Sequence, residues 1–405
     1  MAVRRNIKTN PRHNFDCLIL GAGPVGATAA LLLANQGFSI GIIDRQDPKT
    51  VLKSGFDWRT TALSYGSRAI LDQAGIWKNL AGKSEPILEI EVIDGNGPVH
   101  LDFGKTETHG AAMGHIVLNL DLRRELFAAL QDHKNIELLA PVDVRAMRPD
   151  SAKIEIDLSD GKKLSAALLI ASDGRGSRAR TEWNIPTRQY DYRHHAVIAS
   201  LTHTKPHHNV AYECFLTSGP LALLPMQDIN GKHASSLVWS ESPEKAQALM
   251  DLSDEEFCGI LQDRFGDYLG EFALACDRQK YPLNLIVAKK VYGQRMVLIG
   301  DAAHGIHPIA GQGLNLGFRD IEDLSQSLSR AKKLGLDLGG DTVLKNYARG
   351  REFDVASMIA ATHALNWLFG VDHAAMRGIR GIGLKLVDYI PPLKRAFVKR
   401  AMGDF

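Results

Sequence analysis

Apolar and polar residues change from one periodicity to another near the start of the chain. A short apolar run at residues 17–20 is followed by a glycine turn at 21–26, an Ala- and Leu-rich segment at 27–35 and a second apolar run at 39–43. Short apolar runs bounded by turn residues are typical of buried strands, and the longer segment favours a helix. Strand, helix and strand together have the length of a parallel crossover, so the pattern predicts an α/β unit.

Two later apolar runs end at an acidic residue, as the run before Asp44 does. Residues 168–172 precede Asp173, and residues 296–300 precede Asp301. We predict that both runs are further strands of the same sheet, so this domain is assembled from separate parts of the chain. A glycine loop follows Asp301, and a helix is predicted to start near Leu314.

The segments between these runs have a different pattern. Residues 87–103 and 196–239 alternate apolar and polar positions, which favours antiparallel strands with one packed face in a substrate-side sheet. From about residue 340 onward the pattern predicts helices broken by Gly and Pro. The predicted parts are a nucleotide-binding domain at 1–85, 111–185 and 286–335, a β-rich insertion at 86–110 and 186–285, and a helical C-terminal region at 336–405.

Composition narrows the class of protein. Among 405 residues, 48 basic and 46 acidic side chains give a net charge of +2, so no global field points to nucleic acid. The four cysteines form no CxxC pair, which argues against a zinc site or a disulfide framework and favours a reducing, cytoplasmic setting. Residues 1–14 lack the apolar core of a signal peptide, and no run of about 18 apolar residues predicts a spanning helix.

The glycine turn has the spacing GxGxxG. Gly21 permits the tight turn, Gly23 lets the backbone approach a pyrophosphate, and Gly26 lets helix and strand pack closely. Asp44 lies 18 positions beyond Gly26, near the distance expected of a ribose acceptor. A chance glycine turn is the alternative, but the strand before the turn and the helix after it favour an adenine dinucleotide.

The loop after Asp301 indicates which dinucleotide. Asp301 can accept hydrogen bonds from a sugar-like chain, and Gly311 and Gly313 leave backbone N–H groups free at the start of the next helix. The positive end of that helix would face the flavin pyrimidine edge. Two anchors favour FAD over NAD, and no second GxGxxG marks a nicotinamide domain. A glycine-rich connection without a ligand is the alternative for this loop.

Several motifs resemble one enzyme family. Residues 173–180, with Asp173 and Gly174 leading to Ser177 and Arg178, resemble the third motif of the class A flavoprotein monooxygenases of the para-hydroxybenzoate hydroxylase type. Residues 307–317 with Asp320 look like the signature of the ubiquinone-biosynthesis hydroxylase branch. Residues 57–63, the helix that carries Arg123, and the tail at 365–402 are also similar to that branch. Ser172 and Ala179 depart from the family pattern, which usually has a small apolar residue and Val there.

The resemblance implies an α/β fold, a Rossmann-like FAD-binding domain of GR2 type with an inserted β-rich substrate domain and a helical C-terminal segment. It implies that NAD(P)H reduces FAD, that O2 then forms a C4a-hydroperoxide, and that oxygen passes to the ring of a polyprenyl phenol in ubiquinone biosynthesis. Two alternatives stay open. One is a hydroxylase, epoxidase or reductase of another aromatic or isoprenoid substrate, and the other is a non-catalytic flavoprotein subunit of a membrane complex.

Specific residues are predicted for the site. His307 and Pro308 are the candidates for a catalytic role, whereas packing is the favoured role of His304. A metal site is not predicted, because the histidines between 194 and 208 match no usual ligand motif. The predicted cofactor-binding residues are Gly21, Gly23, Pro24, Val25, Gly26, Asp44, Arg45, Arg59, Arg123, Val144, Asp173, Asp301, Pro308, Gly311, Gly313, Leu314 and Asn315.

The C-terminal tail is basic and amphipathic. Between residues 377 and 400, seven Lys or Arg residues stand against Asp388, with apolar residues at spacings close to helical. Such a segment is typical of docking to a membrane surface or to a partner complex, here a ubiquinone-synthesis complex. A face packed on the body of the protein is the alternative. The expected location is cytoplasmic, peripheral to the inner face of the membrane, and homo-oligomerisation stays open.

Overall fold

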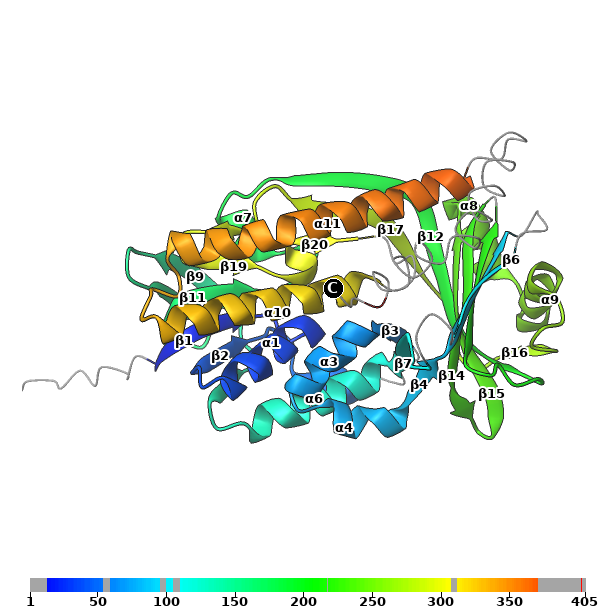
Figure 1. Ribbon diagram of the computed structural model, residues 1–405, viewed down its shortest axis with the longest axis horizontal. Coiled ribbons are helices and arrows are strands. Elements are labelled where there is room, and N and C mark those ends of the chain that lie inside the picture. The colour runs from blue at the N-terminus through cyan, green and yellow to red at the C-terminus, as the bar shows by residue number, and fades with distance from the viewer. Residues whose placement is uncertain are drawn as a thin grey trace, which may run out of the picture.

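One half of the molecule is built on a mainly parallel sheet (Figure 1). The computed structural model describes residues 13–53, 59–94, 100–104, 110–216, 218–306, 312–370 and 402. Strands of this sheet run in the order β18, β19, β11, β1, β2, β8, and a β9–β10 hairpin joins β11 antiparallel. They are β1 (His13–Leu20), β2 (Ile40–Ile43), β8 (Ile136–Leu139), β9 (Val144–Pro149), β10 (Ile154–Leu158), β11 (Lys163–Ala171), β18 (Tyr292–Gly293) and β19 (Met296–Leu298). The three apolar runs that precede Gly21, Asp173 and Asp301 are thus adjacent parallel strands, which confirms the prediction that they share a sheet.

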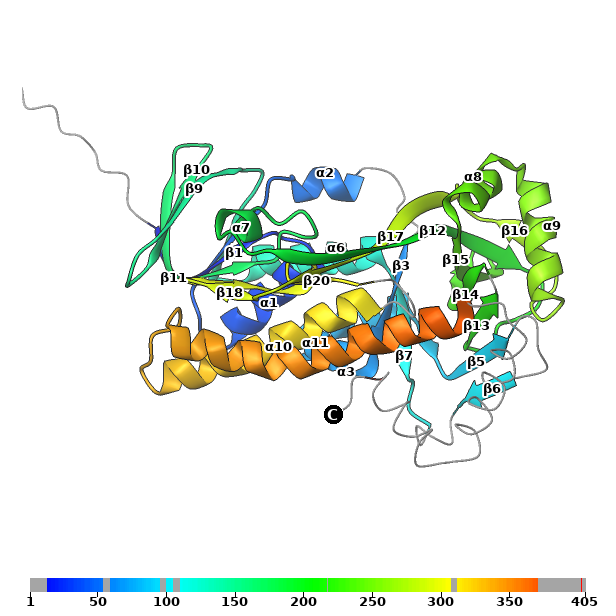
Figure 2. The same cartoon turned by 90° about the horizontal axis from the view of Figure 1, so that it is seen from above.

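The sheet is buried on both faces. Cys17 and Ile19 of β1 pack into the core beneath the helices, whereas Leu18 points to the opposite face. This explains why the strands are continuous apolar runs rather than alternating ones. The helices on the first face are α1 (Pro24–Asn35), α3 (Tyr65–Gln73), α4 (Trp77–Leu80), α6 (Asn119–Asp132), α10 (Gln312–Lys333) and α11 (Asp341–Gly370). The β9–β10 hairpin packs on the second face, on the other side from α10 and α11 (Figure 2).

A second sheet forms the other half. Its described strands run in the order β20, β17, β12, β15, β14, β13, β5, β6, and β16 pairs with β12. They are β5 (Glu89–Asp94), β6 (His100–Phe103), β12 (Thr187–His203), β13 (Val210–Leu216), β14 (Gly219–Ile229), β15 (Lys232–Glu241), β16 (Phe272–Leu274), β17 (Gln279–Ala288) and β20 (His304–Gly305). Helices α8 (Pro243–Asp251) and α9 (Asp254–Phe265) cover its outer face. Its inner face is turned toward the first half (Figure 1).

Three details differ from the sequence pattern. The strands were expected to pair antiparallel, but β5 and β13 are parallel, because they come from separate insertions and no hairpin joins them. A small sheet of β3 (Thr60–Ser64), β7 (Gly114–Leu118) and β4 (Ser84–Ile87) was not predicted, and it contacts β14. Helix α11 runs without a break through Gly350, where packing offsets the roughly 1 kcal/mol that glycine costs relative to alanine.

The first glycine turn is also shorter than predicted. Helix α1 begins at Pro24, so the turn ends at Gly23, which is the N-cap of the helix. Proline suits the first helical position because its φ is already helical and its missing N–H would have no helical partner. Two further helices are short: α2 (Pro48–Lys53) follows β2, and α7 (Arg178–Glu182) follows β11. In the part of the chain that the structure describes, no helix is long and apolar enough to span a membrane.

Candidate functional site

Three loops meet at the carboxyl edge of the parallel sheet. They follow β1, β11 and β19, and they begin at Gly21, Ser172 and Ile299. The chain crosses from β1 to β2 on one side, and β11 lies on the other, so β1 is a switch point of the topology. Ligands of open α/β sheets bind at such a point, outside the carboxyl ends of the strands.

Close packing explains two of the glycines. Gly21 has φ +103°, and a Cβ there would lie 2.6 Å from the carbonyl oxygen of Ser172. A Cβ on Gly26 would lie 2.0 Å from the carbonyl oxygen of Gly21 and 2.3 Å from the Ser172 Oγ. The Ser172 hydroxyl lies within 3.0 Å of the carbonyl oxygens of Leu20 and Gly21. The serine that departs from the family pattern therefore holds the glycine turn.

Gly23 has a different environment. A Cβ at this position would meet no atom within 4 Å, and its φ of −64° is ordinary. Gly23 caps the N-terminus of α1, where the first backbone N–H groups have no helical partner and favour an anion. On α6, the buried Nε of Arg123 has no hydrogen-bond partner among the described residues. Free space, helix N–H groups and an unpaired guanidinium nitrogen together fit a pyrophosphate.

Two cavities meet at this point. The larger, about 1100 Å³, lies between the two halves of the molecule, and the smaller, about 130 Å³, lies beside Asp44. Both are lined by Gly23, Pro24 and Arg123. A long ligand with a central anion fits this layout. The predicted residues that line one or both cavities are Gly23, Pro24, Val25, Asp44, Arg59, Arg123, Asp301, Gly313 and Leu314.

Asp44 ends β2 beside the smaller cavity. One carboxylate oxygen accepts from the backbone N–H of Ala22 at 2.7 Å, and the other accepts from that of Gln46 at 2.8 Å. A carboxylate has about four acceptor sites, so these two bonds orient the group and leave it able to accept from a ribose hydroxyl. Arg45 is exposed and lines neither cavity.

Asp301 lies on the wall of the larger cavity. Its carboxylate is 4.0 Å from the Arg175 guanidinium, which also donates to Asn284 and to the carbonyl oxygen of Gly305. Burial raises the pKa of Asp301, while Arg175 and His304 oppose the shift. An acceptor in this position suits the hydroxyls of a polyol chain.

Six predicted cofactor residues line neither cavity among the described residues, namely Gly21, Gly26, Arg45, Val144, Asp173 and Asn315. Asp173 accepts from the backbone N–H groups of Arg178 and Ala179, at 2.7 and 3.2 Å, and so holds the start of α7. The carbonyl oxygen of Val144 accepts from the Arg178 guanidinium. These contacts position the loop after β11.

Asn315 joins α10 to the small sheet. Its side-chain oxygen accepts from the Ser64 backbone N–H at 2.9 Å and from the Ser67 hydroxyl at 2.7 Å, and its nitrogen donates to the carbonyl oxygen of Ala62 at 2.9 Å. His307, Pro308 and Gly311 lie outside the described residues. Their predicted roles therefore stay predictions.

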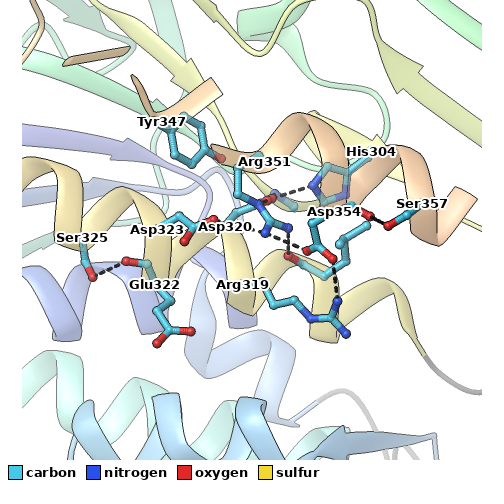
Figure 3. A network of polar contacts seen from close by, with 12 residues as sticks. His304, Arg319, Asp320, Glu322, Asp323, Ser325, Tyr347, Arg351, Asp354 and Ser357 are labelled. Atoms are coloured by element: carbon cyan, nitrogen blue, oxygen red, sulfur yellow. Dashed lines mark hydrogen bonds and ion pairs between the residues drawn. The ribbon is translucent and has the colours of Figure 1, made fainter. Parts of the chain in front are cut away.

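A buried ionic network lies behind Asp301. His304 Nε2 is 2.7 Å from Asp320 Oδ2, and both side chains are almost fully buried. Asp320 also accepts from Arg351 Nε at 2.7 Å and from the backbone N–H of Gly300 at 2.8 Å. Figure 3 shows Arg351 of α11 reaching across to Asp320 of α10 and to Asp354. The network ties the loop after β19 to both long helices, and sequence reasoning did not identify Arg351.

The larger cavity also has wall residues that the sequence patterns did not single out. Asn119, Glu213 and Tyr281 come from three separate elements, and the Arg59 guanidinium lies 5.9 Å from the centre of the Tyr281 ring. One signal was available for Glu213, because it is an acidic residue inside the otherwise apolar run at 210–216. Without the pairing of distant strands, that signal does not say which face the residue occupies.

The histidine-rich segment is engaged in protein contacts. His203 Nε2 lies 3.0 Å from the Ser235 hydroxyl, and His207 Nε2 lies 2.9 Å from the carbonyl oxygen of Met226. Within the described ranges, no three His, Cys, Asp or Glu side chains are placed to share a metal ion.

The fold and the cavities define an α/β dinucleotide-binding protein with a second, β-rich half. A family model described as FAD binding domain matches residues 14–361. Ubiquinone hydroxylase UbiL of Rhodospirillum rubrum is 39% identical over 388 residues, which cover 96% of this chain and 89% of that protein. The 3-demethoxyubiquinol 3-hydroxylase of Escherichia coli K12 is 29% identical over 390 residues, which cover 96% of this chain and 98% of that protein.

A solved structure agrees on the fold. The p-nitrophenol 4-monooxygenase PnpA of Pseudomonas putida superposes with a TM-score of 0.76 at 18% identity, covering 96% of this chain and 99% of that chain. The chain belongs to the FAD-binding domain family and, within it, to the ubiquinone-biosynthesis hydroxylase branch of the class A flavoprotein monooxygenases. This confirms the resemblance, the fold class and FAD as the cofactor.

Proposed function

We propose that this protein is an FAD-dependent monooxygenase that hydroxylates the aromatic ring of a polyprenyl phenol in ubiquinone biosynthesis, with NAD(P)H and O2 as co-substrates. The named activities of its relatives support the reaction class, and the cavity supports the substrate class. When bound, FAD supplies electron transfer from the nicotinamide and the activation of O2. The residues of this chain bind, orient and shield the reactants.

The described residues divide this work among themselves. Asp44 would accept a hydrogen bond from the adenosine ribose, Gly23 and Arg123 would hold the pyrophosphate, and Asp301 would accept from the ribityl chain. The N–H groups at the start of α10, near Gly313, would stabilise negative charge on the flavin. The unpaired Arg123 Nε and the open space at Gly23 are the observations that support this arrangement.

The proposed substrate class is supported by the floor of the larger cavity, which is the part lined by the second sheet. The inner face of the second sheet presents mainly apolar and small side chains, namely Ala196, Ile198, Ala222, Leu224 and Val238. Such a floor binds an aromatic ring with an isoprenoid chain through the burial of apolar surface. It also keeps water from the reacting atoms, which favours oxygen transfer over loss of the oxidant.

The test uses the purified holoenzyme. We expect a yellow protein whose NAD(P)H oxidation rises several-fold when a phenol with a short prenyl chain is added, with a product heavier by one oxygen atom in mass spectrometry. A colourless protein that cannot be reconstituted with FAD would contradict the proposal. So would NAD(P)H oxidation that the phenol does not stimulate. In cells, the quinone intermediate that accumulates when the protein is removed identifies the ring carbon.

A further inference from the structure

Glu213 is an acidic residue on the cavity side of β13. Side chains alternate across a strand, and its neighbours Tyr212 and Cys214 pack into the core beneath α8 and α9. Glu213 therefore points to the opposite, inner face of the sheet. There it lines the larger cavity.

The surroundings of Glu213 are apolar. It lies opposite Ala222 on β14 and Val92 on β5, and Leu224 lines the same wall. No described residue donates a hydrogen bond to its carboxyl group or forms an ion pair with it. Burial raises the pKa of Glu213 to about 7. Glu213 is half-buried, and a carboxyl that faces a cavity without a protein partner can bond to a hydroxyl group of a ligand that enters it.

The other acids on the described cavity wall differ from Glu213. Asp301 faces the Arg175 guanidinium, and Asp277 is exposed. Glu213 on β13 and the strand β12 lie at opposite sides of the apolar cavity floor. Three strand spacings separate β12 from β13, about 14 Å in all, which leaves room for a ring between them.

We propose that Glu213 binds a hydroxyl group on the ring of the substrate and accepts its proton. This inference rests on the proposed ring hydroxylation. The hydroxyl first donates a hydrogen bond to the Glu213 carboxylate. Its O–H bond then breaks, a new O–H bond forms on the carboxylate, and the electron pair stays on the ring oxygen. The ring becomes richer in electrons and accepts oxygen more readily, and the proton returns to water after product release.

The chemistry of the two groups supports the transfer. A phenol such as tyrosine has a pKa near 10, so a carboxyl with a pKa of about 7 is a better matched base than an ordinary carboxylate. Burial is the cause of this pKa shift, and the titratable groups on neighbouring elements act on other residues. On β5, Glu89 and Glu91 act on Tyr212, and His363, the last titratable residue of α11, packs against Tyr190 and Tyr192.

The test compares a phenol with its methyl ether. Both probes carry the same ten-carbon prenyl chain, but the ether has no proton to donate. The wild-type holoenzyme should bind the phenol about tenfold or more tightly than the ether, because hydrogen bonds to charged groups are strong. Glu213→Gln should reduce this preference to about twofold or less. The matched control is Glu91→Gln, in the neighbouring strand on the opposite face, which should keep the full preference.

Kinetics provide a second measurement. In the wild type, kcat for the phenol should fall below pH 7 as Glu213 becomes protonated, and Glu213→Gln should lower kcat at neutral pH at least tenfold and remove this acidic limb. Equal thermal stability of the variants shows that they are folded. If the wild type turns over the phenol and Glu213→Gln keeps both its preference and its pH profile, the inference about Glu213 is wrong. If the wild type itself shows no turnover, the proposed function fails instead.

Discussion

Two glycines in one turn have opposite surroundings. Gly26 is enclosed by the carbonyl oxygen of Gly21 and the hydroxyl of Ser172, whereas Gly23 has open space on its Cβ side. Gly26 has no side chain in the way, so helix and strand can pack closely. The open space at Gly23 leaves room for a ligand. A methyl group added at each position therefore separates packing from binding.

We predict that Gly26→Ala destabilises the apoprotein and that Gly23→Ala does not. Overpacking costs about 1–3 kcal/mol, and the upper end is expected at Gly26 because the obstructing atom belongs to the backbone. Gly23→Ala should instead weaken FAD binding by tenfold or more, since its methyl group would occupy the proposed place of the pyrophosphate. Urea unfolding of the apoproteins and FAD titration provide the two measurements. Unchanged FAD affinity in Gly23→Ala would contradict the placement of the pyrophosphate.

At the scale of elements, α10 and α11 are held together by buried charge. Asp320 of α10 meets Arg351 of α11 and His304 of the loop after β19. Burial by itself would lower the pKa of His304, but the Asp320 carboxylate outweighs it and raises that pKa. Burial opposes the charge of Asp320 too, yet His304 and Arg351 lower its pKa. Both shifts favour the charged forms of the pair.

The pH dependence follows from the raised pKa of His304. Its contribution to stability is complete below the unfolded pKa, near 6.5, and is lost as pH rises through the folded value. We predict that His304→Gln costs about 2 kcal/mol at pH 6, typical of a hydrogen bond to a charged group, and markedly less at pH 9. Denaturant unfolding at several pH values measures this. The control is His233→Gln, which removes a half-exposed pair with Asp228 and should cost less than about 1 kcal/mol. A cost for His304→Gln that rises with pH would contradict this account.

At the scale of the molecule, the larger cavity lies between the two sheets, and under the proposed function an apolar substrate reaches it from a bilayer. A polyprenyl phenol diffuses poorly through water. The basic tail at 377–400 lies outside the described residues, but its charge is known from the sequence. Each Lys or Arg near an anionic surface contributes about 1 kcal/mol of binding.

We predict that Lys394→Glu with Arg395→Glu lowers binding to vesicles of mixed neutral and anionic lipids by about thirtyfold, since about 2 kcal/mol is lost. Co-sedimentation with vesicles measures the effect, which should shrink at high salt. Lys232→Glu with Lys245→Glu makes the same charge change on the second half and should bind as the wild type does. Equal binding by both double variants would show that the tail is not the docking element.

Local sequence was enough for the elements whose geometry depends on neighbours in the chain. The strand before Gly21, the helix after it and the acid at Asp44 follow from spacings within about 25 residues. The site residues were harder to predict where they depend on distant pairing. Asn315 was expected to bind the cofactor, and its described hydrogen bonds go to residues some 250 positions earlier.

The sequence by itself determined the class of nucleotide domain and its cofactor, because glycine positions and strand-end acids dictate backbone geometry and charge locally. The tertiary structure decided which side chains share the cavity wall. Glu213 faces it because of its place on β13, and Arg351 reaches Asp320 because α10 and α11 pack together. These outcomes depend on contacts between segments far apart in the chain, and no local periodicity encodes them.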